Sequence, residues 1–130
     1  MLLGLMCASS GRAQVYTWGY WRMGENTYGA GVGYAVTGAI TDDLANHPLI
    51  PQGTLRYTND LAVEAKIHTG TLLAVDFSSG SYLSNNFAYF ANYVNFGIEA
   101  WVKTRTTSQN HFVVCNGNGV TDGWAIRQSG

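Results

Sequence analysis

The amino-acid sequence predicts an all-β fold, an antiparallel β-sandwich, and three observations support this prediction. Charged residues make up only 12% of the 130 residues, whereas Gly, Thr, Val and Tyr are common. This composition favours strands and turns over helices. Short apolar or alternating runs recur at intervals of about 10 residues, separated by Gly, Asn and Ser. No long amphipathic helical pattern interrupts them, and this favours a sandwich or a barrel.

Composition also excludes two classes of protein. A hydrophobic fraction of 46% and an aromatic fraction of 13% supply enough apolar surface for a core, and this excludes intrinsic disorder. A net charge of −1 excludes a protein that binds nucleic acid through a basic face. We therefore expect one globular domain with no nucleic-acid partner.

The N-terminus resembles a short signal peptide over residues 1–13. An apolar run over residues 1–8 is followed by the small residues Gly11 and Ala13, which fit a cleavage site before Gln14. The alternative is an ordinary apolar strand, because no Lys or Arg precedes the run. The run is too short to span a bilayer, which needs about 20 residues. We therefore expect an exported chain (secreted, periplasmic or at the cell surface) with its domain at residues 14–130 and no transmembrane span.

Cleavage would remove Cys7 and leave Cys115 as the remaining cysteine of the chain. Cys115 lies in an apolar run, so we expect it to be a buried small hydrophobic residue rather than a nucleophile.

Alternation and β-prone residues predict the strands. They are expected at 15–23, 34–40, 72–77, 81–83, 96–103, 111–115 and 124–128. The clearest is 96–103, where Ile98, Ala100 and Val102 share one face. Glu99, Trp101 and Lys103 share the other face.

Turn-forming residues connect these strands. Residues 24–33 form a glycine-rich loop whose spacing does not match the dinucleotide-binding fingerprint. Asp42 and Asp43 begin a polar turn, and residues 61–67 have the pattern of a helix too short to be stable alone. The Asn-Gly-Asn-Gly sequence at 116–119 joins the last two strands as a hairpin.

Several segments together resemble a known family. LAVDFSSGSYL at 73–83, FGIEAWVK at 96–103 and the hairpin at 113–126 are similar, in order and spacing, to a laminin-G-like jellyroll domain of the concanavalin A-like lectin/glucanase superfamily. YWRMGE at 20–25 is similar to the opening strand of its exported bacterial members. The resemblance implies two curved sheets packed face to face, with ligands on loops or on the concave face. It covers only the N-terminal part of such a domain, so we expect the sandwich to be incomplete at the C-terminus.

The resemblance raises the possibility of a glycoside hydrolase. The β-glucanases of the superfamily carry Glu-x-Asp-x-x-Glu on one strand, and retaining enzymes need two carboxyl groups about 5–5.5 Å apart. Glu99 has no second carboxylate at this spacing, and we expect it to pair with Lys103 or a cross-strand neighbour. No catalytic residue is therefore assigned, and we expect the chain not to be an enzyme.

Calcium is the one cofactor that the resemblance suggests. In pentraxin relatives, an acidic or amide pair before the strand that follows this hairpin contributes ligands, and here Asp122 matches, with Asn118 as a neighbour. Calcium takes 6–8 oxygen ligands, typically carboxylates and carbonyls from loops. The alternative is that Asp122 and Gly123 form a tight turn.

Aromatic residues are the candidates for ligand contact. Trp101 and Trp124 are the ligand-binding candidates, and Trp18, Tyr20 and Trp21 are further aromatic residues that could stack on sugar rings. The alternative for each is a place in the core. We therefore expect a non-catalytic exported binding or adhesion module that recognises extracellular carbohydrate or protein, with calcium as a possible aid. The alternatives are a carbohydrate-active enzyme or its appended binding module, and a truncated fragment without independent function.

Overall fold

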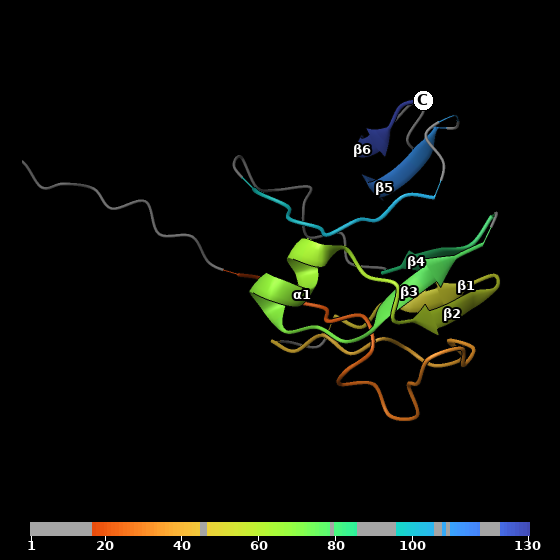
Figure 1. Cartoon of the computed structure of the whole chain (residues 1–130). Coiled ribbons are helices and arrows are strands. Elements are labelled where there is room, and N and C mark those ends of the chain that lie inside the picture. Colours follow the sequence, from red (N-terminus) through yellow and green to blue (C-terminus); the bar gives the residue numbers. More distant parts are fainter. Residues whose placement is uncertain are drawn as a thin grey trace, which may run out of the picture.

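The computed structural model describes residues 17–44, 47–78, 80–85, 96–105, 108, 110–117 and 123–130. In these residues the regular structure is mostly strand, with three two-stranded antiparallel sheets and one short helix (Figure 1). The prediction of a β-rich chain with antiparallel strand pairs is confirmed, whereas the sandwich arrangement stays a prediction. The expected signal peptide at 1–13 and the calcium candidates Asn118 and Asp122 lie outside the described residues.

Two of the strand pairs form one interrupted ribbon. β1 (Ile50–Gln52) pairs with β4 (Tyr82–Ser84), and β2 (Leu55–Thr58) pairs with β3 (Ala74–Phe77). Gln52 lies opposite Tyr82, and Leu55 lies opposite Phe77. The connection between β3 and β4 is therefore longer than the connection between β1 and β2. Between β3 and β4 the Ser81 amide donates to the Ser78 carbonyl over 3.0 Å, a hydrogen bond with the spacing of a β-turn.

The core lies against β2. The amide of Val36 donates to the carbonyl of Leu55 over 3.0 Å, and the amide of Tyr57 donates to the carbonyl of Tyr34 over 2.9 Å. The strand predicted at 34–40 is therefore present only as isolated bridges, at Ala35 and Ile40. The side chains of Val36, Ile40, Leu55 and Tyr57 form the buried cluster, and Ile40 is 0% exposed.

The helix α1 (Val63–Thr69) overlaps the segment predicted to have helical character. It ends at Gly70, which adopts a left-handed conformation (φ 64°) that favours glycine and closes helices. Ala65 and the preceding Leu61 are buried, whereas Val63 and Ile67 are exposed. A seven-residue helix is marginal in isolation, so these buried contacts stabilise it. No helix in the described parts of the chain is long and apolar enough to cross a membrane.

The C-terminal hairpin is confirmed. β5 (His111–Asn116) and β6 (Trp124–Gln128) pair antiparallel, with Asn116 opposite Trp124. The prediction of a buried Cys115 is wrong, because its thiol is free and the residue is exposed. Cys115 lies opposite Ala125, which is also exposed, so this position of the hairpin faces outward.

Two predicted strands are not formed. In the described part of the segment 15–23, the Tyr20 amide donates to a side chain, Asp42, and Met23 has a positive φ of 57° that starts a turn. The segment 96–103 runs without belonging to a strand, between the ribbon and the β5–β6 hairpin in Figure 1. Its alternation predicted which side chains share a face, but a strand also needs a partner to complete the hydrogen-bond ladder.

Candidate functional site

The candidate site begins with a loop closed by the core. Ile40 and Leu49 exchange two backbone hydrogen bonds, of 2.8 and 3.0 Å, and so close the loop that carries Asp42, Asp43 and His47. The amide of Asp43 donates to the carbonyl of Tyr20 over 2.8 Å, which holds the loop beside the segment that carries Trp18. Buried Ile40 thus fixes the position of the polar loop that follows it.

Asp42 is the centre of this loop. Its Oδ1 accepts hydrogen bonds from the amides of Tyr20, at 2.9 Å, and of Leu44, at 3.1 Å. Its Oδ2 lies 3.1 Å from Nδ1 of His47, and the side chain of Asp42 is 0% exposed. Burial acts to raise the pKa of this carboxyl, but the hydrogen bonds from the two amides and His47 outweigh it and lower the pKa below its usual value. Asp42 is therefore a buried anion that stabilises the predicted turn.

His47 is held from several sides. Its ring stacks on that of Trp18, with centroids 5.4 Å apart and planes 29° apart. Its carbonyl accepts hydrogen bonds from Trp21 Nε1, at 2.8 Å, and from Asn85 Nδ2, at 3.0 Å. Trp18 itself is 45% exposed. We name this arrangement, Trp18 backed by His47 and Asp42, the Trp18 platform.

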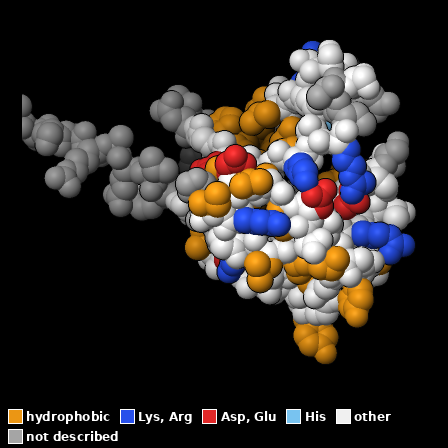
Figure 2. All heavy atoms as spheres, in the orientation of Figure 1, with side chains coloured by type: hydrophobic (Ala, Val, Ile, Leu, Met, Phe, Trp, Pro, Cys, Tyr) orange, Lys and Arg blue, Asp and Glu red, His pale blue; other side chains and the backbone are white. Residues whose placement is uncertain are grey.

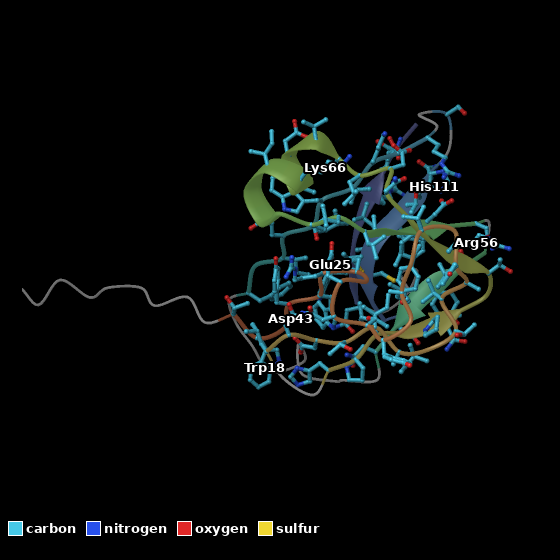
Figure 3. The ribbon with its side chains drawn as sticks, turned by 60° about the horizontal axis from the view of Figure 1, so that its bottom comes forward. Trp18, Glu25, Asp43, Arg56, Lys66 and His111 are labelled. Atoms are coloured by element: carbon cyan, nitrogen blue, oxygen red, sulfur yellow. The ribbon has the colours of Figure 1, made fainter. Side chains whose placement is uncertain are left out.

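Polar groups border the Trp18 platform. Asp43 is exposed, and its Oδ1 accepts a hydrogen bond from Asn26 Nδ2 at 2.5 Å. Tyr20 is 40% exposed. Figure 3 shows Trp18 and Asp43 on one side of the molecule, whereas Arg56, Lys66 and His111 lie away from them. The arrangement offers an aromatic surface beside a carboxylate.

The structure places Trp101 and Trp124 on different elements. Trp101 is 45% exposed on the segment 96–105, and Trp124 is half-buried at the start of β6. The ring of Trp124 contacts that of Phe96, with centroids 5.0 Å apart. Both remain candidates for ligand contact, with Trp101 the more exposed of the two.

Ion pairs attach the segment 96–105 to the rest of the chain. Lys103 pairs with Asp60, and Arg105 Nη2 lies 2.7 Å from Asp76 Oδ2 on β3. Oppositely charged side chains lie next to one another on the face shown in Figure 2. The partner of Lys103 is thus distant in sequence, rather than the neighbouring Glu99 that alternation suggested.

Glu25 is a structural carboxylate that the sequence did not reveal. Its Oε1 accepts hydrogen bonds from the amides of Leu72 and Leu73, the latter at 2.8 Å, and so joins the glycine-rich loop to the chain before β3. Burial acts to raise its pKa, but these hydrogen bonds lower it overall. Its Oε2 is buried without a hydrogen-bond partner in the structure.

Calcium binding stays a prediction, because its candidates Asn118 and Asp122 are not among the described residues. The described residues contain no group of three or more His, Cys, Asp or Glu side chains placed to hold a metal ion. Gly123, next to the candidate Asp122, has a φ of 97°, and a Cβ there would lie 1.7 Å from the Asn116 carbonyl oxygen. Position 123 therefore has no room for a side chain beside the backbone of β5.

The sequence did not reveal that Asp42 and His47 act as a unit. The signal was an Asp five residues before a His in a loop closed by Pro48. No family model, curated protein or solved structure matches the chain. Any functional assignment therefore rests on the geometry of this chain alone.

Proposed function

We propose that this chain is a non-catalytic, exported binding module that recognises carbohydrate, built as part of a laminin-G-like β-sandwich. The observation that carries the proposal is the Trp18 platform. One ring that is 45% exposed is supported from behind by a histidine ring. Sugar rings present apolar C–H faces, and a flat aromatic surface buries such a face without a deep pocket.

Preorganisation supports this proposal. The stacked His47 ring is held by Asp42, whose side chain is fully buried. Binding therefore costs little side-chain entropy at the platform, because the supporting residues are fixed before a ligand arrives. Tyr20, Asp43 and Asn26 supply hydrogen-bonding groups at the border, and polar groups of this kind orient a sugar above the ring.

Trp101 and Trp124 are the alternative contact residues within the same proposed function. Phe96, Trp101 and Phe112 are all exposed on the segment 96–105 or on the adjoining strand β5. Calcium remains part of the proposal only through Asp122 and Asn118, so each binding measurement is made with calcium and with a chelator.

The proposal is tested by titrating the protein with soluble β-glucan, xylan and chitin oligosaccharides. Binding is measured by tryptophan fluorescence and calorimetry. We expect Trp18→Ala to weaken binding by about tenfold or more, equivalent to roughly 1.4 kcal/mol. Tyr82→Ala is the matched control, because Tyr82 is also an exposed aromatic residue (56%) and lies on β4. Loss of binding in Trp101→Ala or Trp124→Ala, with Trp18→Ala unchanged, would move the site to that residue. Absence of binding to every glycan would reject the function.

One observation favours a second candidate, a carbohydrate-active enzyme. A buried aspartate that orients a histidine is a pair used in general acid–base catalysis, and Asp42 and His47 have this arrangement. Release of reducing sugar by the protein, lost in His47→Gln, would support the enzyme. Binding without release supports the module.

A further inference from the structure

We propose that the Trp18 platform selects glycans that carry protonated amino groups, and that Asp43 determines this selectivity. This inference rests on the proposed carbohydrate-binding function and names its ligand class. The ligands would be amino sugars whose nitrogen is not acetylated, rather than neutral or acidic sugars.

The local charge is the first reason. The segments that build the platform carry three carboxylates, on Glu25, Asp42 and Asp43, and one guanidinium, on Arg22. The lysine and arginine labelled in Figure 3, Lys66 and Arg56, lie away from Trp18. A ligand at this surface therefore meets a field that attracts cations and repels anions.

Of these carboxylates, Asp43 is the one available to a ligand. Asp42 is fully buried, with both oxygens committed to protein groups. Glu25 uses Oε1 for the amides of Leu72 and Leu73, and its Oε2 is buried. Asp43 is exposed.

The position of Asp43 is fixed relative to the platform. Its amide bonds the carbonyl of Tyr20, two residues along the chain from Trp18. Its carboxylate accepts a hydrogen bond from Asn26, which restricts its rotamer. A sugar ring stacked on Trp18 would thus present its substituents near a held carboxylate, and an ammonium substituent would form a charge-assisted hydrogen bond there.

Two oligosaccharides with the same ring and linkage provide the test. Glucosamine oligosaccharides, below the pKa of their amines, are compared with N-acetylglucosamine oligosaccharides of equal length by calorimetry, with oligogalacturonate as the anionic probe. We expect the cationic ligand to bind about fivefold or more tightly than the neutral one, and raised salt to reduce this preference. The anionic probe is expected to bind most weakly.

Variants separate this inference from the function on which it rests. Asp43→Asn should reduce the affinity for the cationic oligosaccharide to that for the neutral one, so that the preference is lost. Glu64→Gln, which removes an exposed carboxylate on α1, should leave the preference intact. Equal binding of both oligosaccharides through Trp18, or a preference that survives Asp43→Asn, would overturn the role of Asp43 but not carbohydrate binding. Failure of both to bind would overturn this inference, and carbohydrate binding itself would be overturned only if β-glucan and xylan also failed to bind.

Discussion

The carboxylate of Asp42 lies 3.1 Å from Nδ1 of His47, with the Asp42 side chain completely excluded from solvent. The same carboxylate accepts the amides of Tyr20 and Leu44. One buried anion therefore joins the segment before the glycine-rich loop to the polar loop, and it holds the histidine that supports Trp18. Removal of this group should affect both the stability of the fold and the exposed aromatic surface.

Asp42→Ala should be strongly destabilising. It leaves the partly buried amides of Tyr20 and Leu44 without their acceptor and His47 without its carboxylate partner, and unsatisfied groups of this kind cost free energy. We expect a loss of about 2–4 kcal/mol in the free energy of unfolding, measured by urea titration with tryptophan fluorescence. Asp43→Asn is the control, because this neighbouring carboxyl is exposed, and its effect should stay within about 0.5 kcal/mol. Equal effects of the two substitutions would contradict the structural role of Asp42.

Acid should destabilise the fold through Asp42 and Glu25. The pKa of each carboxyl is lower in the folded chain than its ordinary value, 3.8 for Asp and 4.5 for Glu. A lowered folded pKa contributes stability that is fully present above the ordinary value and is lost as the pH falls through the folded value. Urea midpoints should therefore be steady above about pH 5 and decline below about pH 4. Glu25→Gln should make this decline at low pH smaller. An unchanged decline would contradict the stabilising role of the hydrogen bonds that Glu25 accepts.

Ile40 should be the most sensitive apolar position of the core. It is 0% exposed and lies in the cluster with Val36, Leu55 and Tyr57. Ile40→Ala should cost about 2–5 kcal/mol and Ile40→Val about 0.5–1.5 kcal/mol in the free energy of unfolding. Ile126→Ala on β6 is the matched control, because Ile126 is 46% exposed and its truncation leaves no enclosed cavity. We expect calorimetry to show a larger loss of stability in Ile40→Ala than in Ile40→Val, and no comparable loss in Ile126→Ala.

Local signals predicted the elements that local interactions form. The hairpin of β5 and β6 was predictable, because alternation and an Asn-Gly turn act within a few residues. The helix α1 was recognisable in the same way, although its stability depends on the burial of Ala65. The ribbon of β1 to β4 was predicted only in part. β1 has three residues and β2 has four, so the alternation of Leu55 and Tyr57 with Arg56 is too short to reveal a partner strand.

The site depends on contacts between distant segments, and sequence alone identified only its components. Trp18 was named as a candidate for sugar contact and Asp42 as part of a turn, but the stacking of Trp18 on His47 joins residues from separate segments. No short-range periodicity encodes such a contact. Trp101 was placed on a predicted strand that is not formed, so its neighbours could not be predicted.

Hydrogen exchange should separate the segment 96–105 from the ribbon. This segment belongs to no strand, and its described ion pairs, Lys103–Asp60 and Arg105–Asp76, are formed by exposed or half-exposed side chains. Exposed ion pairs contribute little and are screened by salt. By contrast, the amide of Tyr57 on β2 is hydrogen-bonded and the residue is buried. We expect mass-spectrometric exchange to be fast over 97–104 and slow over 55–58. Arg105→Gln should change the exchange of either segment only slightly, and equal protection of 97–104 and 55–58 would contradict the absence of strand pairing in 96–105.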